Sequence, residues 1–260
     1  MHGGWKSATV EQDIARITKE IDQRGYGAIE NYLSDEELAS LRAFAEFRVR
    51  AAGGEYVGLA GADAVRGTVL SELPRSAEFR SLCRRIYELG TGRRAPQPDF
   101  YQVLRCLHGL SGQRHSNRFH YDSYILTALI PIAIPETGMS GDLVLLPNAR
   151  AIRSSYLGNM LDKIAIDNPF SQAFLRAAAR RNRFGMVRIR LRPGSIYFFW
   201  GYRSIHANEA CDRDRLRATA LFHYVDPHQQ SWARGVIRAA KARMGRGPLE
   251  TTKGQAAQNL

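Results

Sequence analysis

The spacing of apolar residues changes between residues 90 and 99, and no other feature constrains the fold as strongly. Upstream, apolar residues recur every three or four positions in three segments. The first covers 9–23, the second follows a capping box formed by Ser34 and Glu37, and the third covers 75–90. This spacing is typical of amphipathic helices. A short strand is expected over 28–33, between the first two helices.

Beyond residue 99 the apolar segments are shorter, rich in β-branched and aromatic residues, and separated by Gly, Pro and Asn. They predict strands at 99–107, 118–134, 142–146, 183–191, 195–200 and 216–224. Helices first and strands afterwards predict an α+β fold with a mainly β core. The same order argues against an alternating parallel sheet.

A second helical pattern interrupts the strands over 148–182 and predicts a helical insertion. Such insertions often cover active sites, and the alternative is that this one supports packing or a subunit contact. The chain has 260 residues, enough to bury one substantial core. We expect a single domain over 1–230, followed over 231–260 by a basic amphipathic helix, Trp232 to Met244, and a polar tail.

The apolar runs are too short for a membrane span. The longest covers residues 125–135 and is broken by a threonine and a proline, whereas about 20 apolar residues are needed. The N-terminus has no apolar stretch of signal-peptide length, so a cytoplasmic protein is expected. Cys83, Cys106 and Cys211 are scattered and odd in number, which predicts buried thiols and neither a disulfide framework nor a zinc site built of cysteines.

The formal net charge of +12 accompanies an ordinary hydrophobic fraction of 44%. The basic residues are spread along the chain and are not interleaved with aromatic residues in a recognisable nucleic-acid-binding module. Solvated faces are the favoured interpretation, so nucleic acid is not the expected partner.

The decisive stretch for function is His120-Tyr121-Asp122. Residues two apart in a strand face the same way, so the imidazole and the carboxylate converge on one point. A second imidazole would complete the two-histidine, one-carboxylate set that leaves three positions open on an octahedral Fe(II). His206 is the candidate, and His223, on the last predicted strand, is its competitor.

A cationic pattern follows His206 in the sequence. Arg217 and Thr219 share one face of the last predicted strand. A guanidinium binds a carboxylate through two parallel hydrogen bonds, and a neighbouring hydroxyl can donate another. Arg215 is also an odd-numbered residue beside this strand, so it remains the alternative to Arg217 as the residue that binds a carboxylate.

Together these motifs resemble the His-x-Asp…His…Arg-x-Ser/Thr pattern of the Fe(II)/2-oxoglutarate-dependent oxygenases. The N-terminal part resembles the phytanoyl-CoA-hydroxylase-like branch, in which a helix precedes segments like 25–29 and 33–38. Segment 141–147 is similar to the family's Gly-rich strand that follows the His-x-Asp pair. Segment 193–199 is similar to the strand that leads to the distal histidine. The resemblance covers residues 10–226.

The resemblance implies a double-stranded β-helix, or jelly roll, with N-terminal helices and a helical insertion. It implies a dioxygenase that couples C–H oxidation of a small molecule to decarboxylation of 2-oxoglutarate to succinate. The implied cofactor is Fe(II), with 2-oxoglutarate and O2 as cosubstrates. The implied metal ligands and catalytic residues are His120, Asp122 and His206.

The resemblance also implies cosubstrate contacts. Arg217 and Thr219 would anchor the distal carboxylate of 2-oxoglutarate, and Thr127, Gln102 and Tyr101 are candidate additional contacts whose alternative role is sheet packing. The presence of Asp122 argues against an iron halogenase and favours hydroxylation or desaturation. The nucleic-acid demethylase branch carries another arginine after the cosubstrate arginine, and residues 220–222 lack one.

The expected walls of the substrate pocket mix aromatic and cationic side chains from the insertion and from Tyr101, Arg105, Tyr124, Trp200, Tyr202 and Arg203. An anionic or aromatic small molecule is the substrate that such walls favour, unless these residues only pack the mouth of the barrel. The sequence carries no signal for an oligomeric state.

Two other readings compete with the oxygenase. One is a non-catalytic basic binding protein on a jelly-roll scaffold, motivated by the charge and by the 232–244 helix, that would contact nucleic acid or a membrane. The other is an iron enzyme of the same fold that needs no 2-oxoglutarate.

Overall fold

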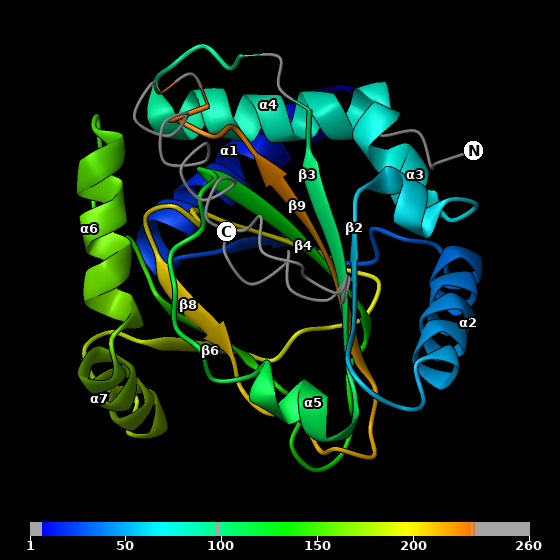
Figure 1. The fold of residues 1–260 in the computed structure, drawn as a ribbon. Coiled ribbons are helices and arrows are strands. Elements are labelled where there is room, and N and C mark those ends of the chain that lie inside the picture. The colour runs from blue at the N-terminus through cyan, green and yellow to red at the C-terminus, as the bar shows by residue number, and fades with distance from the viewer. Residues whose placement is uncertain (1–6, 97–98, 230, 232–260) are drawn as a thin grey trace.

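The computed structural model describes residues 7–96, 99–229 and 231 (Figure 1). Within them, the helices are α1 (Ser7–Arg24), α2 (Asp35–Ala51), α3 (Val69–Glu72), α4 (Ala77–Thr91), α5 (Gly109–Arg114), α6 (Tyr156–Asp167) and α7 (Pro169–Arg180), with short 3-10 turns at Ala62–Val65 and Leu73–Arg75. The strands are β1 (Gly27–Ile29), β2 (Val57–Ala60), β3 (Tyr101–Leu107), β4 (Leu126–Ala133), β5 (Leu143–Leu146), β6 (Val187–Ile189), β7 (Ile196–Phe199), β8 (Ile205–Asn208) and β9 (Arg217–Tyr224).

The strands form two antiparallel sheets. The larger has the order β1-β7-β4-β9-β3-β2, and the smaller has the order β6-β5-β8. The inner faces of the two sheets pack through a small apolar cluster that includes Leu129 and Phe199 of the larger sheet and Leu143 and Leu145 of the smaller. Two antiparallel sheets with helices at the start of the chain and between strands agree with the α+β prediction.

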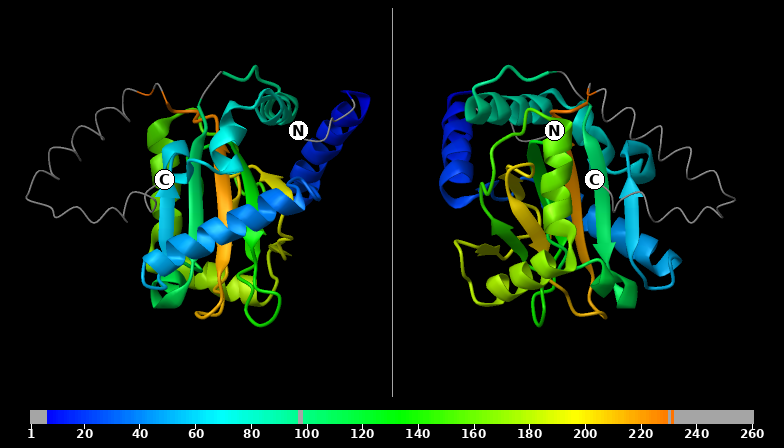
Figure 2. Two further views of the ribbon diagram at one scale, coloured as in Figure 1. Left: turned by 90° about the vertical axis from the view of Figure 1, so that its right-hand side faces the viewer. Right: turned by 60° about the vertical axis from the view of Figure 1, so that its left-hand side comes forward.

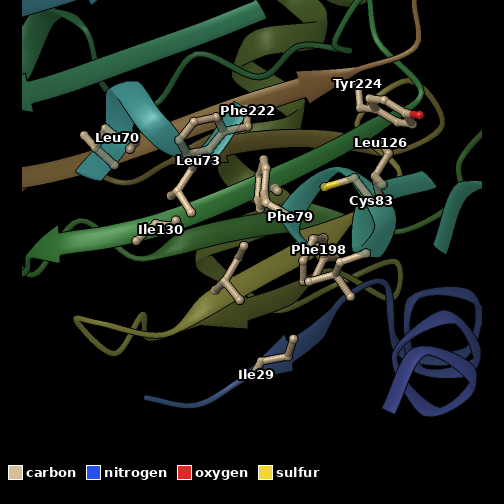
Figure 3. Packing of buried hydrophobic residues seen from close by; sticks show 14 of the residues in the cluster. Ile29, Leu70, Leu73, Phe79, Cys83, Leu126, Ile130, Phe198, Phe222 and Tyr224 are labelled. Carbon is tan, nitrogen blue, oxygen red and sulfur yellow. The ribbon is translucent and has the colours of Figure 1, made fainter. Parts of the chain in front are cut away.

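The outer face of the larger sheet is covered by the N-terminal helices (Figure 2). Even-numbered residues of β9, such as Ala220 and Phe222, belong to this core together with Phe79 of α4. Figure 3 shows Phe79 and Cys83 of α4 beside Phe222 of the sheet. Because side chains alternate across a strand, the odd-numbered residues of β9 face the other sheet.

The helical predictions agree with the structure. Helices α1 and α4 cover the predicted segments, and Ser34 and Glu37 form the reciprocal capping box at the start of α2. The insertion contains α6 and α7, which lie on the opposite side of the molecule from α2 (Figure 1). The predicted C-terminal helix, 232–244, lies outside the described residues.

Some strand predictions were wrong in extent. The chain turns at Asn31, with a φ of 51°, so β1 ends at Ile29. Of the predicted strand 118–134, only 126–133 is a regular strand. Positive φ angles at Asn182 and Phe184 delay β6 until Val187. The short strands β2 and β8 were missed.

All three cysteines are free and buried, as predicted. None of the described helices is long and apolar enough to cross a membrane.

Candidate metal and cosubstrate site

The first two candidate ligands lie on an irregular segment, 117–122, that runs beside β8. His120 and His206 exchange both of their backbone hydrogen bonds, each at 3.0 Å. The backbone N–H of Asp122 then donates to the carbonyl of Gly201 at 2.9 Å. This pairing with β8 brings residues that are far apart in the sequence into direct contact.

The side chains of His120, Asp122 and His206 converge. Their ligand atoms all lie within 4.8 Å of one another, with Asp122 Oδ1 at 3.7 Å from His120 Nε2 and 3.4 Å from His206 Nε2. The Nδ1–H groups of His120 and His206 donate to the carbonyls of Arg118 and Ser204 at 3.0 and 3.1 Å. Both Nε2 atoms are therefore free of the ring proton, which is the tautomer that a metal ligand requires.

Asp122 is held by two features of the larger sheet and its neighbouring turn. The hydroxyl of Thr127 donates to Asp122 Oδ2 at 2.5 Å. A Cβ at Gly201 would overlap Asp122 Oδ2 and lie 2.5 Å from Thr127 Oγ1, so only glycine fits there. The carboxylate is thereby fixed with its Oδ1 toward the two histidines.

The electrostatics suit a cation. Burial raises the pKa of Asp122, but the imidazoles of His206, His223 and His120 outweigh burial and hold that pKa well below its usual range. Desolvation by the surrounding protein, and then the proximity of His206, lower the pKa of His120 below its usual range, although 37% of the side chain remains exposed. At neutral pH the site presents an ionised carboxylate and a neutral His120. Burial acts to lower the pKa of His206, whereas Asp122 raises it more strongly.

His223 is not part of the convergent cluster. Its Nδ1 lies 3.1 Å from Thr127 Oγ1 and 3.5 Å from Asp122 Oδ2, on the side of the carboxylate away from the other histidines. Its ring stacks with Tyr101 and Tyr124 at centroid distances of 5.9 and 5.4 Å. The geometry therefore favours His206 over His223 as the second imidazole.

The helical insertion holds the segment that carries His120 and Asp122. The side-chain amide of Gln172 of α7 accepts from the backbone N–H of Phe119 at 3.0 Å and donates to the Phe119 carbonyl at 2.7 Å. These two hydrogen bonds are the ones that a neighbouring strand would otherwise form. The guanidinium of Arg150 lies between the rings of Tyr121 and Tyr202, at 3.8 and 4.2 Å. It also pairs with Asp162 of α6 at 2.8 Å.

Arg217 and Thr219 both lie on the inner face of β9, and both are 2% exposed. Arg217 Nε donates to the Gly141 carbonyl at 2.7 Å, and its Nη1 lies 3.4 Å from Thr219 Oγ1. Gly141 has a φ of 72°, and a Cβ there would lie 2.5 Å from Arg217 Cδ. Arg215 is exposed and precedes the strand, so it does not share this position.

Arg217 is a buried cation. Among the described residues no carboxylate forms an ion pair with it. Burial, and then the proximity of Arg105, lower the pKa of Arg217 to about 10, so the guanidinium stays charged at neutral pH. A buried charge is stable only when it is paired, so this position fits an anionic ligand.

An open cleft lies beside the cluster, and His120 and Asp122 are part of its lining. Its lining includes the predicted wall residues Tyr101, Arg105 and Tyr124, and also Ser123, which accepts a hydrogen bond from Lys163 of α6 at 2.6 Å.

Four of the residues predicted near the cosubstrate or substrate lie elsewhere. Gln102 has even parity on β3, so its amide points to the helical side and donates to the Leu70 carbonyl at 2.9 Å. Trp200 and Tyr202 are fully buried in the helix-covered core, and Arg203 interacts with Asp22 at 3.5 Å. Thr127 does lie at the site, where its hydroxyl contacts Asp122.

Sequence reasoning missed two residues that shape the site, Gly201 and Gln172. A glycine directly after a buried strand can indicate close approach of another group, and Gly201 follows β7 closely. A glutamine in a helix gives no comparable signal, because its partner, Phe119, is 53 residues away.

No protein-family model and no curated protein sequence matches the chain. The structure is similar to that of EctD from S. alaskensis with bound Fe (TM-score 0.55, 17% identity, covering 86% of this chain and 79% of that one). It is also similar to the epimerase SnoN in complex with Fe3+, alpha ketoglutarate and nogalamycin RO (TM-score 0.53, 16% identity, covering 82% and 84%).

A third similar structure is the Trichoplax adhaerens prolyl hydroxylase in complex with a hypoxia inducible factor oxygen degradation domain peptide fragment (TM-score 0.53, 12% identity, covering 87% and 97%). At these identities the likeness establishes the fold. The chain therefore has the double-stranded β-helix fold of the iron- and 2-oxoglutarate-dependent oxygenases, and it carries a His-x-Asp…His cluster.

Proposed function

We propose that the chain is a non-haem Fe(II)/2-oxoglutarate-dependent oxygenase that oxidises a C–H bond of a small molecule, by hydroxylation or desaturation. Fe(II) bound by His120, Asp122 and His206 would activate O2, with 2-oxoglutarate converted to succinate and CO2. Assignment to the phytanoyl-CoA-hydroxylase-like branch stays a prediction.

The observation that carries this proposal is the combination of an open three-ligand cluster with an unpaired buried guanidinium on the same inner face. A convergent set of two imidazole nitrogens and one carboxylate oxygen fits the facial triad of non-haem iron enzymes. Arg217, beside Thr219, offers charge-assisted bonds to the distal carboxylate of a keto-diacid. An iron enzyme without 2-oxoglutarate would leave that buried charge unpaired.

The residues of the chain have separate tasks in this scheme. Thr127 and Gly201 keep the Asp122 carboxylate turned toward the metal position. Gln172 keeps the ligand-bearing segment against β8. The cleft along Tyr101 and Tyr124 gives the substrate access to the open side of the cluster.

An anaerobic titration tests the proposal. Fe(II)-loaded protein should develop a metal-to-ligand charge-transfer absorption band as 2-oxoglutarate is added, and aerobic turnover should release succinate. Replacing His206 or Asp122 by Ala should abolish tight Fe(II) binding. Absence of the band in the unmodified protein would refute the 2-oxoglutarate assignment.

The cosubstrate anchor is tested by Arg217→Ala with Arg215→Ala as the matched control. Loss of a charge-assisted contact worth about 1.5–3 kcal/mol should weaken 2-oxoglutarate binding by about 10- to 150-fold in the first variant. The second should bind 2-oxoglutarate as the unmodified protein does, because Arg215 is exposed. Equal effects in the two variants would remove Arg217 from this role.

A further inference from the structure

A second guanidinium, that of Arg105, lies on the same inner face of the larger sheet as Arg217 but at a different position. Arg105 lies on β3 directly opposite Thr219 of β9, on the inner face of the larger sheet. It lines the open cleft together with His120 and Asp122, whereas Arg217 is not among the residues that line the cleft. The two arginines therefore occupy different positions on one face of the sheet, and of the two Arg105 lines the cleft.

Arg105 has no acidic partner among the described residues. Its Nη2 donates to the His115 carbonyl at 3.1 Å, which leaves most of its N–H donors without an acceptor among these residues. Its positive charge contributes to the lowered pKa of His120 and Arg217 and opposes the rise in the pKa of His206, so it lies near both the metal cluster and the cosubstrate anchor.

In the proposed complex the positive charge of Arg105 is not balanced by any other group of the site. The charge of Fe(II), reduced by that of Asp122, and the charge of Arg217 together match the two negative charges of 2-oxoglutarate. Asp122 is the only acidic residue among the described residues that line the cleft. The charge of Arg105 is then balanced best by a monoanion, and a planar guanidinium favours a carboxylate.

The rest of the cleft wall is aromatic. Tyr101 and Tyr124 stack at a centroid distance of 5.7 Å with an interplanar angle of 5°, and His223 stacks against both. Both tyrosines line the cleft, beside Asp122. A planar apolar body on these rings, with its anionic group at Arg105, would extend past the metal cluster.

We propose that Arg105 is a substrate-binding residue that selects a small carboxylic acid with a planar apolar body. This inference rests on the proposed function, because it assumes that the distal carboxylate of 2-oxoglutarate binds Arg217. It names the substrate class and assigns Arg105 to the substrate and not to the cosubstrate.

The test uses benzoate, phenylacetate and 3-phenylpropionate with their primary amides as probes. Binding is measured by anaerobic calorimetry on protein saturated with Fe(II) and 2-oxoglutarate. At least one acid should bind about tenfold or more tightly than its amide. Arg105→Gln should abolish that preference, and Arg105→Lys should retain part of it because the charge remains. Arg192→Gln, at an exposed arginine paired with Glu30, is the matched control and should keep the full preference.

The same variants separate this inference from the proposed function. Arg105→Gln should bind 2-oxoglutarate within about threefold of the unmodified protein, while Arg217→Ala should not. If Arg105→Gln loses 2-oxoglutarate as Arg217→Ala does, Arg105 belongs to the cosubstrate and the inference is overturned. It is also overturned if no acid is preferred over its amide. Failure of the proposed function appears differently, as the absence of 2-oxoglutarate binding to the unmodified protein.

Discussion

The two sheets hold their parts of the site by different means. The larger sheet carries Arg217, Thr219 and Thr127 on strands whose opposite face is packed against helices by an apolar core. The smaller sheet carries His206, and the neighbouring segment with His120 is held by side-chain hydrogen bonds from the insertion. The cosubstrate side is therefore backed by the large apolar core, whereas the metal side is held by a smaller apolar cluster around Phe119 and Tyr121 together with a few polar contacts.

The outer surfaces show the same contrast. The large side chains of α4 that face the sheet are buried, and Phe79 is fully so. On the insertion, Leu161 and Phe170 remain 63% and 88% exposed. The insertion thus leaves large apolar side chains exposed on its outer side. Its inner side packs Leu175, Ala178 and Ala179 against Phe119 and Tyr121 in a small apolar cluster, and it adds the polar contacts of Gln172.

The largest effect is expected in the helix-covered core. Phe79→Ala should lower the free energy of unfolding by about 3–5 kcal/mol, because it removes a buried ring that packs against Phe100 and Phe222. Phe170→Ala, the same change on the exposed insertion, should alter it by no more than about 0.5 kcal/mol. Urea unfolding followed by circular dichroism measures both, and similar losses would break the contrast.

The next largest effect is expected on metal affinity. Gly201→Ala places a Cβ against the Asp122 carboxylate, which must then turn away from the histidines. We expect Fe(II) to bind about 100-fold more weakly, a loss of about 2.7 kcal/mol. Competition with a chelator measures this affinity, and circular dichroism of the metal-free variant checks that it is folded. Unchanged affinity would show that the carboxylate is not held from this side.

A smaller effect is expected from the insertion. Gln172→Met keeps the length of the side chain but leaves both backbone groups of Phe119 without a partner. Loss of such outer contacts commonly weakens metal binding by about 10- to 100-fold, and we expect the lower end. Gln172→Glu retains the acceptor for the Phe119 N–H and should fall between Gln172→Met and the unmodified protein. Full Fe(II) affinity in Gln172→Met would limit the insertion to a packing role.

The smallest effect sharpens the comparison. Gly158 lies in α6, where an added Cβ would meet only Ser155 Cβ at 4.0 Å. Gly158→Ala should stabilise α6 by about 0.5–1 kcal/mol through reduced backbone entropy. Fe(II) affinity should not change, which makes this variant the glycine control for Gly201→Ala. Hydrogen exchange of α6 amides measures the stabilisation, and unchanged protection would contradict it.

Much of the fold and the site could be predicted because the relevant signals are local. The capping box at Ser34, the helical spacing of the insertion, and the alternation of β9 each depend on neighbouring residues. His120 and Asp122 are two residues apart, so their convergence follows from local parity. The resemblance to a known pattern then supplied His206.

The errors have a common physical origin in contacts between distant segments. Segment 118–125 has strand-like composition, but only one edge of it finds a strand, and Gln172 occupies the other edge at Phe119. Gln102 was assigned to the site together with Tyr101, although adjacent strand residues face opposite sides. Trp200 and Tyr202 were placed at the pocket although both are packed in the core.

The alternation of β9 has a consequence for how the chain can vary. Arg217, Thr219 and His223 face the cavity, while Ala218, Ala220 and Phe222 face the helices. Deletion of a single residue within the strand would turn a guanidinium into the apolar layer and an aromatic ring toward the ligand, so both functions would fail at once. Changes in length between β8 and β9 should therefore be tolerated only in the turn at 209–216.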